Sequence, residues 1–384
     1  MNWTLEFTKP ITMTNFKKGI LLCLLFFFTT MTVIAHVEKV YSLEGTIGDR
    51  EVIMELRSVE GYYNGRYSFR DEKKTIYMEV EFDSLTFTLN SLRYNLETKK
   101  QESFEQIVIT EDSFHNWSGK QRTPDGKIYE VFLRPIKINQ SKPHAIKNED
   151  FKKTLSPYNY SLLSDIKYES TSIQKLKKGV KIEWLTETVS QIKIFRFVEG
   201  YPDSTMVKIN NYLEQFFIKD ILKGYNYENY ETEINIHYAS PYLLSIVESI
   251  KSNISNTKAT DSIVYLTLDL KNLKTLNLED LLWLGEGEVP RNGSREYFKY
   301  RIDVFEGKIE KYLNDSYSKE IKNSKCSYAN EKTFRFPDFY LSKKGIVLML
   351  NHYKLSEECK KQTWAVLRYN DFPDKWNQVY FKKK

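Results

Sequence analysis

The chain has 384 residues and a formal net charge of +6, and 41% of its residues are hydrophobic and 15% aromatic. This apolar content can fill sizeable cores, which excludes an intrinsically disordered chain. Because the 57 basic residues are nearly balanced by 51 acidic ones, the charge does not indicate a nucleic-acid partner, which needs a concentrated basic surface.

Residues 1–35 have the pattern of a secretory signal peptide. Lys17 and Lys18 precede an uncharged apolar run over 20–34, which leads to a small-residue cleavage site after Ala35. The run is shorter than the roughly 20 residues that span a bilayer, so we expect cleavage rather than a transmembrane anchor. The mature protein is therefore predicted to be periplasmic or secreted.

Residues 36–135 are predicted to form a β-rich domain. Apolar and polar side chains alternate over 52–57, 76–80 and 85–89, and turn residues separate these runs. Many short strands at regular spacing, without a helical period, are typical of an antiparallel meander or a barrel-like sheet.

Residues 136–160 are polar and are predicted to be a linker between two domains. Residues 161–384 mix strand patterns with two main helices. Pro202 opens the first, which Gly224 is expected to cap, and the second covers 295–322. We therefore expect an α+β chain, with an N-terminal antiparallel β domain followed by a mixed α+β domain that contains an antiparallel sheet.

Two cysteines, Cys326 and Cys359, remain once the signal peptide and its Cys23 are removed. An even number of cysteines in an exported chain favours a disulfide. The alternative is a pair of buried free thiols.

No sequence motif identifies a catalytic, cofactor or metal site. The chain lacks His-Glu-x-x-His and Cys-x-x-Cys zinc patterns, a Gly-x-Ser-x-Gly elbow and a phosphate-binding loop. Ser-x-x-Lys occurs at Ser172 and Ser316, without the partner motifs of serine acyl-enzymes. We predict no cofactor and no metal, whereas a dispersed pair of carboxylates for glycoside hydrolysis stays open.

Three aromatic residues near predicted turns, Tyr62, Tyr63 and Trp117, are candidates for stacking on sugar rings. The alternative is that they complete a small β core.

Several segments resemble known families. They include Ile209-Asn210-Asn211-Tyr212-Leu213, Pro241-Tyr242-Leu243-Leu244-Ser245-Ile246 and Leu341-Ser342-Lys343-Lys344-Gly345-Ile346. Through these, residues 180–372 resemble the extracytoplasmic domain of unknown function at the C-terminus of the lysozyme-sensing anti-sigma factor. That domain also accompanies peptidoglycan deacetylase domains. Residues 42–134, through Leu43-Glu44-Gly45-Thr46-Ile47-Gly48, are similar to a small β domain of uncharacterised exported bacterial proteins.

The resemblance implies a binding role in the cell envelope, with a lysozyme-like protein or peptidoglycan as the partner. The deacetylase module itself is absent from the sequence, so its activity is not implied. A basic lysozyme would be attracted only if this positively charged chain has a local acidic face. We expect a non-enzymatic binding protein; the alternative is an unrecognised cell-wall hydrolase or a deacetylase accessory that uses dispersed carboxylates.

Overall fold

The computed structural model describes residues 38–381, apart from residues 60, 96–99, 140–141, 177–178, 228, 253–259, 327, 329–331, 351–354 and 361. The predicted signal peptide lies outside the described residues. Among the helices that are described, none is long and apolar enough to cross a membrane.

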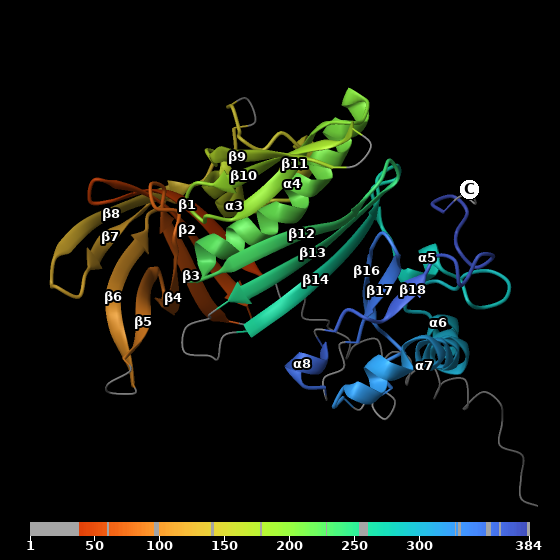
Figure 1. The fold of residues 1–384 in the computed structure, drawn as a ribbon. Helices are drawn as coiled ribbons and strands as arrows, with labels where there is room; N and C mark the ends of the chain where they lie inside the picture. Colours follow the sequence, from red (N-terminus) through yellow and green to blue (C-terminus); the bar gives the residue numbers. More distant parts are fainter. Residues whose placement is uncertain are drawn as a thin grey trace, which may run out of the picture.

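The first part of the chain is a closed antiparallel barrel, at the left of Figure 1. Each strand pairs with its neighbours in sequence, and β1 also pairs with β8 to close the barrel. The strands are β1 (Lys39–Ile47), β2 (Arg50–Val59), β3 (Tyr62–Phe69), β4 (Thr75–Asp83), β5 (Thr86–Asn95), β6 (Lys100–Glu111), β7 (Trp117–Arg122) and β8 (Ile128–Pro135). The barrel-like sheet predicted from the alternating pattern is confirmed.

Strand β2 shows how the barrel is joined to the rest of the chain. Its inward side chains Val52, Met54 and Leu56 fill the barrel and are completely buried. Ile53 points the other way and is also completely buried, because it belongs to the core of the following α+β part. A strand that is covered on both faces reads as a continuous apolar run rather than an alternating one.

The segment over 136–160, which the sequence predicts to be a linker, contains α2 (Glu149–Lys152) and the start of α3 (Pro157–Leu163). Ile146 and Tyr158 are completely buried in the same core as Ile53. The burial of these two residues could not be predicted from the sequence, because they are isolated in a polar segment and follow no helical or strand period.

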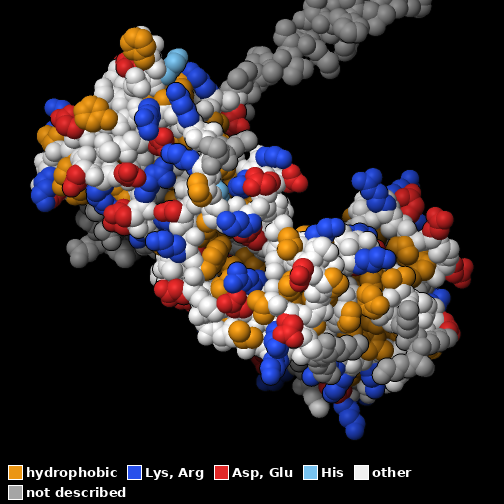
Figure 2. Space-filling view, turned by 90° about the horizontal axis from the view of Figure 1, so that it is seen from above, with side chains coloured by type: hydrophobic (Ala, Val, Ile, Leu, Met, Phe, Trp, Pro, Cys, Tyr) orange, Lys and Arg blue, Asp and Glu red, His pale blue; other side chains and the backbone are white. Residues whose placement is uncertain are grey.

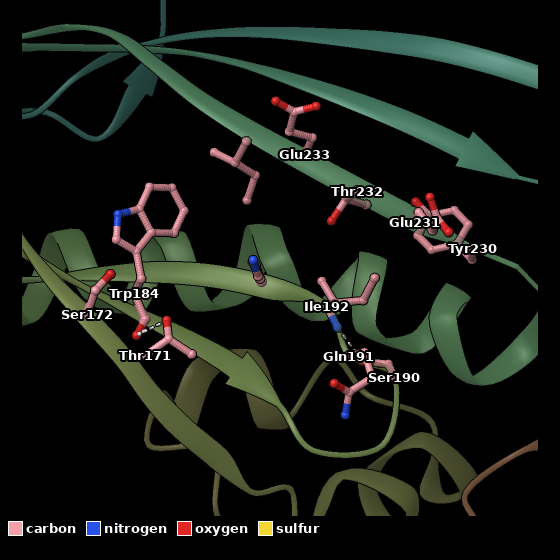
Figure 3. A pocket seen from close by; sticks show the side chains of 12 residues that line it. Thr171, Ser172, Trp184, Ser190, Gln191, Ile192, Tyr230, Glu231, Thr232 and Glu233 are labelled. Atoms are coloured by element: carbon pink, nitrogen blue, oxygen red, sulfur yellow. Dashed lines mark hydrogen bonds between the residues drawn. The ribbon is translucent and has the colours of Figure 1, made fainter.

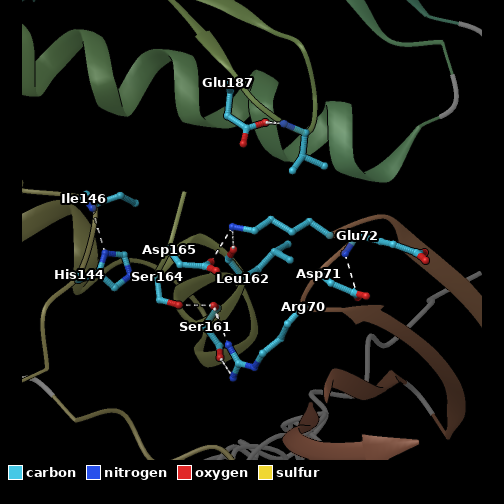
Figure 4. A network of polar contacts seen from close by, with 12 residues as sticks. Arg70, Asp71, Glu72, His144, Ile146, Ser161, Leu162, Ser164, Asp165 and Glu187 are labelled. Carbon is cyan, nitrogen blue, oxygen red and sulfur yellow. Dashed lines mark hydrogen bonds and ion pairs between the residues drawn. The ribbon is translucent and has the colours of Figure 1, made fainter. Parts of the chain in front are cut away.

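Polar contacts of α3 tie the barrel to the α+β part (Figure 4). The hydroxyl oxygens of Tyr158 and Ser68 are 2.7 Å apart. Lys73, in the turn after β3, is only 5% exposed and donates to Asp165 Oδ1 at 2.6 Å and to the carbonyl oxygen of Leu162 at 3.2 Å. A buried ammonium needs such partners, so these contacts fix the turn against α3.

The second part is α+β, as predicted. Its first sheet has the order β11-β10-β9 and its second the order β12-β13-β14-β15. The elements are β9 (Tyr168–Lys175), β10 (Lys181–Glu187), β11 (Lys193–Glu199), α4 (Asp203–Asn226), β12 (Glu231–Ala239), β13 (Leu243–Ser252), β14 (Thr260–Asp269) and β15 (Lys274–Thr275). Figure 1 shows α4 beside both sheets, and its apolar side chains Ile209, Leu213, Phe217 and Ile221 share one core with them.

Helix α4 begins after Pro202, as predicted, but Gly224 does not cap it, because the helix continues to Asn226. A Cβ atom at Gly224 would lie 2.7 Å from the Cβ atom of Ser190. The glycine is therefore needed for the close approach of the helix to the turn before β11.

The C-terminal lobe contains the second main helix and a small sheet with the order β16-β17-β18. The helix runs through α6 (Arg295–Tyr300), the π-helical η2 (Arg301–Phe305) and α7 (Glu306–Asn323), and it is kinked at Tyr317, whose backbone is not helical. The other elements are α5 (Leu278–Leu281), β16 (Asp338–Leu341), β17 (Gly345–Met349), α8 (Glu357–Lys360) and β18 (Val366–Arg368).

The predicted disulfide between Cys326 and Cys359 is present, with the two Cα atoms 5.8 Å apart. It joins the chain that follows α7 to α8. On the face drawn in Figure 2, basic and acidic side chains are interspersed over the barrel at the left, and hydrophobic side chains gather over the C-terminal lobe at the right.

Candidate functional site

One end of the barrel is free of the α+β part and carries the candidate site. In an up-and-down barrel, the start of β1 and the turns β2–β3, β4–β5 and β6–β7 meet at the same end. The turn that contains Lys73 lies at the opposite end, where α3 packs. We call the free end the hairpin end; its described residues are 38–41, 57–59, 61–63, 81–87 and 111–117.

An aromatic cluster fills the barrel beneath the hairpin end. The ring centroid of Phe87 lies 4.4 Å from that of Phe82, 4.9 Å from that of Trp117 and 5.5 Å from that of Tyr63. Tyr41 completes the cluster, with its centroid 5.2 Å from that of Trp117. Tilted and edge-on aromatic pairs at these distances are mutually stabilising, so the cluster forms a firm base for the turns above it.

The structure separates the three aromatic residues that the sequence suggests for sugar stacking. It brings Tyr63 and Trp117 together in the aromatic cluster through Phe87. Trp117 is only 1% exposed, so no face of its ring is free for a ligand, and it fits the alternative of core packing. Tyr62 points to the other face of β3 and is 80% exposed.

Each of the three turns at the hairpin end presents a large exposed side chain. Tyr62 follows the β2–β3 turn, Leu85 lies in the β4–β5 turn and is 61% exposed, and Phe114 lies in the β6–β7 turn and is 81% exposed. The sequence analysis did not select Leu85 or Phe114. The available signal was a large apolar residue among turn residues such as Asp, Ser and Asn.

The β6–β7 turn is organised so that Phe114 stays exposed. Asp112 Oδ1 accepts hydrogen bonds from the backbone N–H groups of Phe114 and Asn116, both at 2.8 Å. These bonds, led by that from Asn116, lower the pKa of the Asp112 carboxyl. His115 adopts a left-handed backbone conformation with φ of 63°, which completes the reversal of the chain.

The hairpin end has a local surplus of carboxylates, although the chain as a whole is positively charged. Its charged residues are Glu38, Glu81, Asp83, Glu111 and Asp112 against Lys39 and Arg57. Arg57 is already partnered, since its Nε atom lies 3.1 Å from Glu38 Oε1. His115 Nδ1 likewise lies 2.7 Å from Glu111 Oε1. Exposed aromatic rings in surroundings with this excess of acids are suited to a basic partner.

Carboxylates also lie together in the core, but without access to a ligand. Asp220 of α4 is 4% exposed and Glu248 of β13 is 1% exposed. Burial, with the nearby charge of Asp220, raises the pKa of Glu248 to about 8. In the part of the chain that is described, no group of three or more His, Cys, Asp or Glu residues could hold a metal ion.

No family model and no curated protein matches the chain. Among solved structures, the chain is similar to a crystal structure of a member of the DUF3298 family from Bacteroides fragilis. The identity is 15%, the TM-score is 0.28, and the alignment covers 55% of this chain and 94% of that one. A likeness of this size assigns no function, so the site is argued from its own side chains.

Proposed function

We propose that the protein is an exported, non-enzymatic binding protein of the bacterial envelope, periplasmic or secreted, and that it contacts its ligand with the hairpin end. One observation supports this most directly: three neighbouring turns present Tyr62, Leu85 and Phe114 to solvent above a packed aromatic cluster. Exposed apolar side chains that gather on adjacent turns mark interaction surfaces, and aromatic rings are frequent anchors of binding energy.

The ligand proposed first is a basic, lysozyme-like protein. The surplus of carboxylates around the three turns supplies the local acidic face that such a partner requires. In such a complex, electrostatic attraction raises the association rate, and the apolar anchors slow the dissociation. The affinity should therefore fall as salt is raised, while the anchors decide how fast the complex dissociates.

The test measures the binding of purified mature protein to a basic lysozyme by surface plasmon resonance. We expect Phe114→Ala to weaken binding by about tenfold or more, mainly through faster dissociation. Ile128→Ala is the control, because Ile128 is 54% exposed at the start of β8, where it pairs with Arg122 at the end of β7 that is farther from the β6–β7 turn. Equal affinities of the two variants for lysozyme would contradict the proposal.

A cell-wall glycan is the second candidate ligand, because the ring of Tyr62 is free to stack on a sugar. Cosedimentation with purified peptidoglycan tests this candidate. If the ligand is a glycan, the wild-type protein should be retained by peptidoglycan and should not bind lysozyme, and Tyr62→Ala should abolish the retention. Soluble fragments released from the peptidoglycan by repurified protein would instead favour the hydrolase alternative.

A further inference from the structure

A groove separates the two sheets of the α+β part (Figure 3). Its volume is about 570 Å³. One wall comes from β9, β10 and the turn that leads into β11, and the other from the start of β12. Its lining residues are Thr171, Ser172, Trp184, Ser190, Gln191, Ile192, Lys193, Tyr230, Glu231, Thr232, Glu233 and Ile234.

Strand β12 presents a free edge to this groove. Among the described strands, β12 pairs only with β13, and β11 across the groove pairs only with β10. In an antiparallel strand, alternate residues direct their N–H and C=O groups away from the partner strand. β11 lies close to part of β12. The outward-facing backbone donors and acceptors that an added strand could bind are therefore those at the start of β12, where it lines the groove.

The side chains that line the groove determine which residues an added strand should carry. Glu231 and Glu233 are exposed and lie on the same face of β12, two residues apart. Between them, Thr232 has a buried hydroxyl oxygen without a hydrogen-bond partner among the described residues. The indole of Trp184 lies at the end of the groove, and its Nε1 atom donates to Gln174 Oε1 at 2.8 Å.

We propose that the groove binds an extended polypeptide segment, which adds as a strand to the free edge of β12. The segment carries basic residues at alternate positions, facing Glu231 and Glu233, and an apolar residue that packs against Trp184. Backbone bonds to the edge supply affinity and the alternating side chains supply specificity, as in other cases of strand addition. This site is separate from the hairpin end and goes beyond the function proposed for it.

The test uses a short fluorescent peptide of alternating lysine and valine, whose binding to the mature protein is followed by anisotropy. We expect saturable binding, no binding of the matching glutamate–valine peptide, and a loss of about tenfold or more in E231Q/E233Q. Asp261→Asn is the matched control, because Asp261 is exposed on β14 and does not line the groove.

N-methylation of the peptide distinguishes strand addition from simple charge attraction. Methyl groups on alternate amides should abolish binding in one register and leave it nearly unchanged in the other, because only one edge of an added strand is hydrogen-bonded. The proposal is overturned if no peptide binds, if both registers behave alike, or if a glycan oligomer binds instead. It is also overturned if sedimentation shows that a second copy of the chain occupies the edge.

Discussion

Glu248 is a carboxyl group held in an apolar core. It lies on β13 beneath α4, and its Oε1 atom has no hydrogen-bond partner among the described residues. Its neighbour Asp220 accepts from the hydroxyl of Tyr230 at 2.6 Å and pairs with Lys223 at 3.2 Å. The core thus favours the protonated form of Glu248, which is the cause of its raised pKa.

This carboxyl should make stability fall with rising pH. A group whose pKa is raised from 4.5 to about 8 contributes stability that is complete below the unfolded-state pKa and is lost as the pH rises towards the folded-state value. Between about pH 5 and pH 8.5, Glu248→Gln should therefore gain about 2 to 4 kcal/mol relative to the wild type. Urea denaturation across this range measures the difference.

The control for this prediction is Glu169→Gln, since Glu169 is exposed on β9. It should follow the wild-type pH dependence. Parallel stability curves for wild type and Glu248→Gln would show that residue 248 does not hold its proton in the folded state.

At the residue scale, sequence identifies the candidate side chains better than it identifies their surroundings. The disulfide was predicted from the even number of cysteines in a chain that is expected to be exported. Tyr62 and Tyr63 are equivalent in sequence, but the alternation of β3 places one in solvent and the other against Phe87. The burial of Trp117 could not be predicted from the sequence, because it depends on the closure of the barrel. Only the pairing of β7 with β6 and β8 shows that its ring is enclosed.

At the scale of elements, the disulfide holds together pieces that have little regular structure. Cys326 and Cys359 are 33 residues apart, and Cys359 belongs to the core of the C-terminal lobe. The hydroxyl of Tyr328 adds a hydrogen bond to the carbonyl oxygen of Cys359 at 3.1 Å. The crosslink therefore restricts a loop that a four-residue α8 could not anchor alone.

Replacing both cysteines by serine should lower the free energy of unfolding by about 3 to 4 kcal/mol, because a 33-residue loop regains its freedom in the unfolded chain. Guanidinium denaturation with and without a reductant measures this. Reductant should destabilise the wild type and leave the double variant unchanged. A wild-type protein insensitive to full reduction would refute the prediction.

Most elements follow from apolar periodicity, and the exceptions have a clear cause. Strand β9 was not predicted because its residues are mostly exposed and polar, with the sequence YESTSIQK, and it forms by pairing with β10. Strand β7 is similar: apart from Trp117 it is polar, and pairing with β6 and β8 defines it. Such strands depend on partners far away in sequence.

For the whole molecule, Tyr158 is the main link between the barrel and the α+β part. Its ring is completely buried, and the guanidinium of Arg66 lies 4.3 Å from the ring centroid. Tyr158→Ala should cost about 3 to 5 kcal/mol, since it removes a large core side chain and leaves Ser68 without this partner. Chemical denaturation checks the value.

Tyr62→Ala serves as the control, because an 80% exposed tyrosine contributes little to folding and its loss should change stability by less than about 0.5 kcal/mol. If Tyr158→Ala were as mild as this control, α3 would not couple the two parts. The division into domains at residues 136–160 stays a prediction; the buried side chains of that segment were not foreseeable from its polar composition.

The connectivity of the barrel has a further consequence for how recognition could change. Each turn of the hairpin end joins two strands that are neighbours both in sequence and in the sheet. A turn can therefore be lengthened, shortened or exchanged without disturbing the register of any other pair, and the packed rings below remain in place. The three turns form an interchangeable set on a fixed frame, so new ligand specificities could be grafted onto this barrel one loop at a time.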